Sequence, residues 1–287
     1  MGATTIDYLG HTWNPLAMRC TPCSPGCEHC WHLRTAARLG NNPAVQNHKR
    51  AAYLGQTFMG ESGPILDRKT LNEPLKRKKP TVYGTQFMGD IFHNEVSHRY
   101  VLAILSVISK CPHHTFLMLT KRANNMRDFF SYFHKDLKLD ILPNLWLGVT
   151  ICNQEEADEK IPILLQTPAA HRWVSYEPAL GPIKIPGILD GCTRGTGSIF
   201  NCDEYCTVIG PCYYRLEGEW GIDFIVAGAE TGPGARPADN EWFRDVRDQC
   251  IAAGVPYFQK KCTGPTPDDL NVRELPWKKG EPDGHKN

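Results

Sequence analysis

This chain of 287 residues lacks two things: an excess of one charge and a long apolar run. Its 32 Lys and Arg side chains face 31 Asp and Glu, for a formal net charge of +1. Proteins held on nucleic acid by their overall field carry a strong basic excess, so only a local basic patch is compatible with this balance. No apolar run approaches the roughly 20 residues of a membrane-spanning helix. The opening Met-Gly-Ala-Thr-Thr also lacks the features of a signal peptide, so we expect no membrane partner.

Cysteine, in contrast, is plentiful, with 12 in the chain. In a small secreted domain such a number would indicate disulfides. In a chain of this length without a leader it indicates reduced thiols, some of them bound to metal, and therefore a cytoplasmic protein.

Four cysteines form one short motif, Cys20-x2-Cys23-x3-Cys27-x2-Cys30, followed by Trp31. Three thiolates on such a loop can hold a [4Fe-4S] cluster and leave one iron open for a ligand. Four thiolates can instead form a structural zinc site. The long alternation of strand and helix patterns after the motif favours a cluster at the mouth of an α/β domain.

Short apolar runs alternate with helical patterns along the rest of the chain. This alternation predicts parallel strands joined by right-handed crossovers. We expect a single α/β domain over residues 1–287, a complete or partial TIM-type (β/α) barrel, with a doubly wound open sheet as the alternative. The strands are expected at Thr5–Trp13, Thr81–Met88, Thr115–Thr120, Leu145–Thr150, Arg172–Tyr176, Ile222–Ala227 and Val255–Gln259, and the helices at Tyr100–Lys110, Arg122–His134, Glu155–Gln166 and Asn240–Ala253.

Two segments interrupt this rhythm. Residues 40–80 are polar, and the basic run Lys76–Lys79 within them is either a solvated face or a contact for nucleic acid. Residues 186–221 form an insertion before the sixth strand. It carries four cysteines that are either free thiols or the ligands of a zinc ion or a second cluster: Cys192, Cys202, Cys206 and Cys212.

Charged and amide side chains follow six of the expected strands. Because parallel barrels gather function at the carboxyl ends of their strands, these side chains should share one mouth. They are Asp90, Lys121, Arg122, Asn153, Glu177, Glu230 and Lys260.

Several motifs together resemble the phage-associated three-cysteine proteins, a divergent branch of the radical-SAM superfamily. They span roughly residues 5–262 and are Thr12-Trp-Asn-Pro15, the cysteines from Cys20 to Cys30, Met88-Gly-Asp-Ile-Phe-His93, Thr115–Arg122, Trp146–Thr150, Val174–Pro178 and Ala227–Pro237. The family spacing, C-x6-C-x2-C, corresponds to Cys20, Cys27 and Cys30. The common superfamily spacing would instead use Cys23 as the first ligand, and the insertion has no counterpart.

The resemblance implies reductive cleavage of S-adenosylmethionine at a [4Fe-4S] cluster and abstraction of hydrogen from a substrate. It implies an external electron donor of the flavodoxin or ferredoxin type. Cofactor contacts are expected from Trp31, Met88, Gly89, Asp90, Thr150, Asn153 and Glu177, and the catalytic candidates are Glu177, Glu230, Lys260 and Cys262.

The resemblance also suggests a substrate, because proteins of this kind are associated with phage DNA modification. Isomerisation of an aminoacyl-type group on a thymine methyl would suit radical chemistry, in the host cytoplasm if the chain is phage-encoded. Two alternatives are a radical-SAM lyase that repairs DNA, with Cys262 as hydrogen donor, and a zinc-stabilised module that binds nucleic acid without catalysis.

Overall fold

The computed structural model describes residues 4–57, 63–186 and 221–278. The strands are β1 (His11–Trp13), β2 (Leu16–Ala17), β3 (Ile65–Leu66), β4 (Val82–Thr85), β5 (Thr115–Thr120), β6 (Leu145–Ile151), β7 (His171–Tyr176), β8 (Phe224–Ala227) and β9 (Tyr257–Gln259). The α-helices are α1 (Trp31–Gly40), α2 (Asn47–Leu54), α3 (Arg68–Leu71), α4 (His98–Ser109), α5 (Ala123–Lys135), α6 (Gln154–Gln166) and α7 (Asn240–Ala253).

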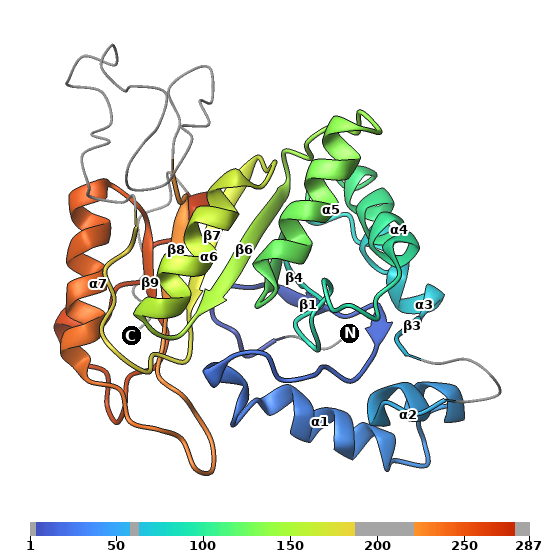
Figure 1. Ribbon diagram of the computed structural model, residues 1–287, viewed down its shortest axis with the longest axis horizontal. Helices are drawn as coiled ribbons and strands as arrows, with labels where there is room; N and C mark the ends of the chain where they lie inside the picture. The colour runs from blue at the N-terminus through green and yellow to red at the C-terminus, as the bar shows by residue number, and fades with distance from the viewer. Residues whose placement is uncertain (1–3, 58–62, 187–220, 279–287) are drawn as a thin grey trace.

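Seven strands form one parallel sheet in the order β1-β4-β5-β6-β7-β8-β9. This order follows the chain without reversal, so right-handed crossovers carry every helix to the same face of the sheet. A doubly wound sheet reverses its order at a switch point, and that alternative is therefore wrong. The sheet curls into a half-barrel with α4, α5, α6 and α7 outside it (Figure 1). The partial barrel predicted from the sequence is confirmed.

The two faces of the sheet carry different cores. In β5, Phe116 and Met118 join the large core under the helices, whereas Leu117 and Leu119 point to the concave side. This alternation follows from the two-residue period of a strand. The concave side holds an aromatic cluster that includes Trp173 and Phe224. A side chain on Gly148 would lie 2.4 Å from Nε1 of Trp173, so glycine is required where the indole crosses β6.

Residues 40–80 contain more regular structure than the polar pattern indicates. They include α2, α3 and β3, which pairs antiparallel with β2. A side chain on Gly40 would lie 2.4 Å from Leu54, which indicates that α1 and α2 pack closely. Nearly all of the cysteine-rich insertion, with its four cysteines, lies outside the described residues. Within the described ranges, no helix is long and apolar enough to span a membrane.

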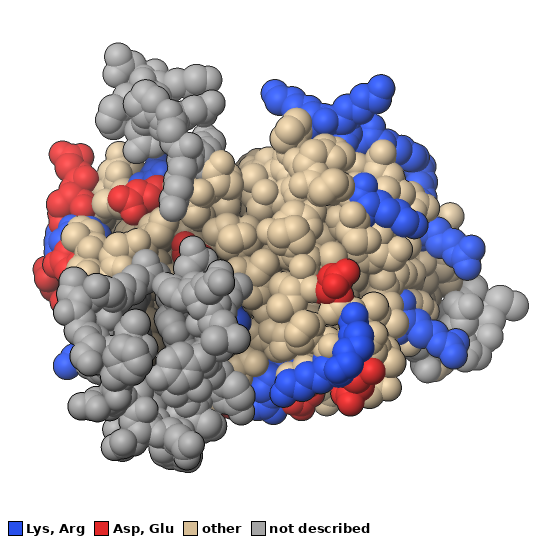
Figure 2. Space-filling model, turned by 90° about the horizontal axis from the view of Figure 1, so that it is seen from above, with Lys and Arg blue, Asp and Glu red and all other residues tan. Residues whose placement is uncertain are grey.

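The two edges of the sheet, where its strands begin and where they end, differ in what lies at them. At the C-terminal edge, toward which the β6 arrow points, lie the cysteine loop and α1 (Figure 1). The opposite, N-terminal edge is the face seen in Figure 2, where Lys and Arg gather along one side and much of the middle carries neither charge.

Candidate functional site

A cavity of about 260 Å³, here named the cysteine pocket, opens at the C-terminal edge. It brings together residues from the ends of β4, β5, β6, β7, β8 and β9 with the cysteine loop. The predicted site residues that line it are Cys20 and Cys23, Cys27, Cys30, Trp31, Gly89, Asp90, Lys121, Arg122, Thr150, Glu177, Glu230 and Lys260.

Three predicted residues lie outside this lining. The backbone N–H of Met88 donates to Oδ1 of Asn14 at 2.8 Å. Asn153 caps α6, because its Oδ1 accepts from the backbone N–H of Glu156 at 3.0 Å. Cys262 is buried in the core under the helices. Its position gives no support to a role as hydrogen donor in the pocket.

The thiols of the loop differ in environment. Cys27 is buried and Cys23 is exposed, and the two side chains share a hydrogen bond. The hydrogen bond from Cys23 lowers the pKa of Cys27 to about 5, and it raises the pKa of Cys23 correspondingly. Burial raises the pKa of Cys20, and the Asp90 carboxylate adds to that effect. A thiolate is the form that binds metal, and this hydrogen bond favours the thiolate of Cys27 over that of Cys23.

The donor chemistry of this loop fits an iron-sulfur cluster, because four thiols face one cavity. Among the residues described, no group of three or more His, Cys, Asp or Glu side chains is arranged to hold a single metal ion. A cubane cluster sets its ligand sulfurs farther apart than a single ion does, since iron atoms lie between them. The fit of the loop to a cluster therefore rests on its four thiols and on the cavity that they line.

Arg122, directly after β5, holds the first half of the cysteine loop. Its Nη1 donates to Asp90 at 3.1 Å and contacts Sγ of Cys20 at 3.6 Å. Its Nη2 donates to the backbone oxygen and the hydroxyl of Thr21, at 2.8 and 3.0 Å. Both carboxylate oxygens of Asp90 accept further hydrogen bonds, because Thr120 and the backbone N–H groups of Phe92 and Lys121 also donate to them.

Arg236, in the glycine-rich loop after β8, holds the second half. It forms an ion pair with the buried Glu230 at 2.6 Å and another with Glu28 at 2.8 Å. It also donates to the backbone oxygen of Pro25 at 3.1 Å. Hydrogen bonds to Glu230 raise the pKa of Arg236 and lower that of Glu230, so both stay charged. The two arginines thus fasten the loop to distant strand ends.

A charged pair forms another wall of the pocket. Nζ of Lys260 lies 2.7 Å from Oε1 of Glu177, and the hydroxyl of Ser175 donates to the same carboxylate at 3.3 Å. Tyr8 lies beneath, with Nζ of Lys260 5.9 Å from its ring centre. Burial, with help from Glu177, raises the pKa of Tyr8 well above its usual range, so the phenol stays neutral.

Sequence reasoning missed Arg236, His93 and His32. Nε2 of His93 lies 2.8 Å from the hydroxyl of Thr21, which adds a third fastening of the loop. His32 lines the pocket with 3% of its surface exposed, and neither ring nitrogen has a partner among the described residues. Burial and the nearby Arg19 lower its pKa to about 4. The motifs Met88–His93 and Ala227–Pro237 were the available signals for His93 and Arg236, whereas the position of the His32 ring cannot be read from spacing.

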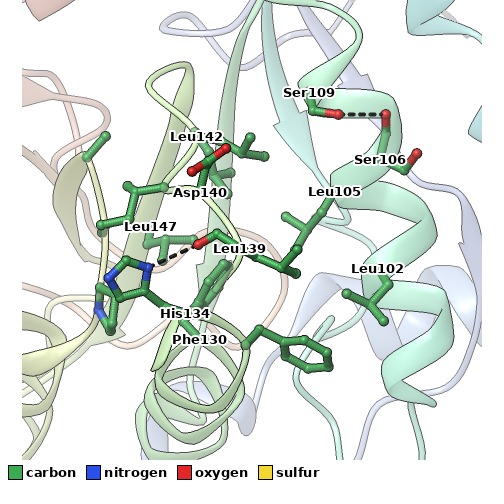
Figure 3. A pocket seen from close by; sticks show the side chains of 16 residues that line it. Leu102, Leu105, Ser106, Ser109, Phe130, His134, Leu139, Asp140, Leu142 and Leu147 are labelled. Carbon is green, nitrogen blue, oxygen red and sulfur yellow. Dashed lines mark hydrogen bonds between the residues drawn. The ribbon is translucent and has the colours of Figure 1, made fainter. Parts of the chain in front are cut away.

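A second cavity, of about 390 Å³, lies away from the cysteine pocket between α4 and α5 (Figure 3). Its walls are mainly leucine and phenylalanine side chains, including Leu102, Leu105 and Phe130. Nδ1 of His134 lies 3.0 Å from the backbone oxygen of Leu139 at its rim. It contains none of the predicted site residues.

A family model described as "Protein of unknown function (DUF5131)" matches residues 3–281. No curated protein and no solved structure matches the chain.

Proposed function

The chain belongs to the DUF5131 family, and from its site we propose that it is a radical-SAM enzyme. The observation that carries the proposal is the convergence of Cys20, Cys23, Cys27 and Cys30 on the cysteine pocket, which strand ends also line. Cys27 and Cys30 would hold a [4Fe-4S] cluster together with Cys20 or Cys23. Such a cluster, when bound, would supply the one-electron chemistry by which S-adenosylmethionine is cleaved reductively and hydrogen is abstracted from a substrate.

The protein's own residues would position and shield this chemistry. Arg122 and Arg236 fasten the cysteine loop, which fixes the thiols relative to the strand ends. We assign Asp90 a positioning role, because both of its oxygens are already occupied. Thr150, Gly89 and the Glu177–Lys260 pair remain the groups available to cofactor and substrate.

The aromatic cluster under the pocket would exclude water from a reactive radical. Tyr8 and Trp173 are almost fully buried there, and their rings meet edge to face at 6.2 Å. A dry floor suppresses side reactions of an open-shell species. The reducing electron would come from an external donor of the flavodoxin or ferredoxin type.

The rival proposal is a zinc-stabilised nucleic-acid-binding module. It accounts for four thiols, but it gives no role to the adjoining cavity or to the Glu177–Lys260 pair. A radical-SAM repair lyase would share the cofactor, and the buried position of Cys262 does not favour it. An isomerase acting on a modified thymine remains our preferred reaction type.

The experiment is anaerobic reconstitution followed by assay of iron, sulfide and zinc, and then of 5′-deoxyadenosine after addition of dithionite and S-adenosylmethionine. We expect about four irons per chain, with matching sulfide, and formation of 5′-deoxyadenosine. About eight irons would add a second cluster in the insertion. Zinc without sulfide, and no cleavage, would contradict the proposal and support the binding module.

A further inference from the structure

The exposed face of α1, beside the cysteine pocket, combines one aromatic and two basic side chains. Trp31, Arg34 and Arg38 stand three and four residues apart, a spacing that places them on one side of a helix. Trp31 is 50% exposed, although large aromatic side chains are usually buried. On the other side of α1, His32, Ala36 and Gly40 are buried.

This face borders the pocket directly. Trp31 is one of its lining residues. Nη2 of Arg34 comes within 2.9 Å of the position that a side chain on Gly232 would occupy, so Arg34 reaches the loop after β8. His32, at the start of the same helix but on its buried side, also lines the pocket, and its two ring nitrogens have no partner among the described residues.

The surrounding segment has few acidic side chains, although the chain as a whole is nearly neutral. Residues 8–57 contain five Lys and Arg and one carboxylate, Glu28. Arg50 donates a hydrogen bond to the backbone oxygen of Gly40, and Lys49 forms an ion pair with Asp67. Within the described part of the chain, Arg34 and Arg38 have no ion pair to a carboxylate.

We propose that this face of α1 binds a single strand of nucleic acid. Arg34 and Arg38 would contact phosphates, and a base would stack on Trp31 beside the pocket. A basic track with exposed aromatic side chains is the usual means of binding unpaired strands. The sequence predicted a cofactor contact for Trp31, and its half-exposed indole also offers a face on which a base can stack. The inference rests on the proposed function, since it names the substrate class for the same pocket.

The test is fluorescence anisotropy of a labelled single-stranded oligonucleotide on the full-length chain, repeated at several salt concentrations. The variant Arg34→Ala/Arg38→Ala should bind more weakly, and the slope of log K against log salt should fall by about 1.4, since each lost phosphate contact in a single strand removes about 0.7. Trp31→Ala should bind roughly ten- to hundredfold more weakly with an unchanged slope, and Trp31→Phe should recover most of the loss.

The matched control is Lys76→Ala/Lys78→Ala, which removes two exposed cations at the opposite edge of the sheet. It should leave both affinity and slope unchanged. Equal losses in control and α1 variants would overturn the proposal, because binding would then follow general charge. Tight binding of duplex with no dependence on Trp31, or no binding of single strands, would also overturn it.

The test separates the two proposals because binding is measured without turnover. Circular dichroism and iron content of each variant show whether fold and cluster site are intact. A wild-type protein that forms 5′-deoxyadenosine normally but does not bind single strands would contradict only the inference. Strand binding by a protein that contains zinc and no sulfide would contradict only the radical chemistry.

Discussion

The two edges of the half-barrel use charge in opposite ways. At the C-terminal edge, charged side chains are buried and matched: the Asp90 and Arg122 side chains are 8% and 12% exposed and 3.1 Å apart. At the N-terminal edge, Lys76, Lys78 and Lys79 precede β4 and are exposed. Matched charges fix geometry, whereas exposed ones contribute little to stability. The difference indicates that side-chain positions are fixed by ion pairs at the C-terminal edge and not by the lysines at the N-terminal edge.

The largest expected effect is on iron content, which should depend on the cysteines at the C-terminal edge and not on a cysteine at the N-terminal edge. Cys27→Ala and Cys30→Ala should each reduce iron in the reconstituted protein from about four per chain to below one, with loss of 5′-deoxyadenosine formation. Cys111, buried before β5 at the N-terminal edge, is the control. Cys111→Ala should keep full iron content and lose on the order of 1 kcal/mol of stability. Equal loss of iron in all three variants would contradict a ligand role for the loop.

The next effect tests the buried pair beside β6. Oε1 of Glu156 lies 2.5 Å from Nζ of Lys160, and its Oε2 accepts from the backbone N–H of Cys152 at 2.9 Å. Glu156→Gln should reduce the free energy of unfolding by about 3–5 kcal/mol, because Lys160 is left charged and buried. Asp128→Asn, which removes the exposed partner of Arg127, should change it by less than about 0.5 kcal/mol. Urea denaturation measures both.

The same pair predicts how stability depends on pH. Burial opposes its charge, but hydrogen bonds from Cys152 and Lys160 leave the pKa of Glu156 below its usual value. The unfolded chain therefore binds this proton more readily, so the contribution is complete above the ordinary glutamate pKa and is lost as pH falls through the lower, folded value. The stability difference between wild type and Glu156→Gln should shrink in acid. A difference constant down to pH 3 would show that the pair is not its source.

A smaller effect is expected at the clamp on the cysteine loop. Arg122→Gln removes the contacts to Asp90, Cys20 and Thr21 together and should cost about 2–3 kcal/mol of stability. The reconstituted cluster should also lose iron faster to a chelator. Arg127→Gln, on the outer surface of α5, is the matched control. Unchanged chelation kinetics in Arg122→Gln would mean that Arg236 and His93 are enough to hold the loop.

Much of this architecture could be read from the sequence because local patterns determine it. Thr115–Thr120 and Asn240–Ala253 were predicted with the bounds observed, since apolar periodicity and the capping Asp239 define them. The sequence predicted a barrel, but it did not decide between a complete and a partial one or exclude a doubly wound sheet, because closure depends on the order of strands in space.

The site was predictable only in part. Its location followed from the rule that function gathers at the carboxyl ends of parallel strands, and most strand-end residues do line the pocket. Asn153 did not follow the rule, because an asparagine at that position also caps a helix. Arg236 was missed because its partners, Glu28 and Pro25, are more than 200 residues away in the chain.

The smallest expected effect concerns the basic run Lys76–Lys79, which was interpreted from the sequence as either a solvated face or a nucleic-acid contact. Its lysines are exposed and stand at the edge away from the cysteine pocket. The triple variant Lys76→Ala/Lys78→Ala/Lys79→Ala should change the free energy of unfolding by less than about 0.5 kcal/mol and leave iron content and 5′-deoxyadenosine formation unchanged. If these lysines instead anchored a strand that enters the pocket, the variant would need more substrate to reach the same rate. Turnover measured against oligonucleotide concentration therefore decides whether the N-terminal edge contributes to the reaction in the cysteine pocket.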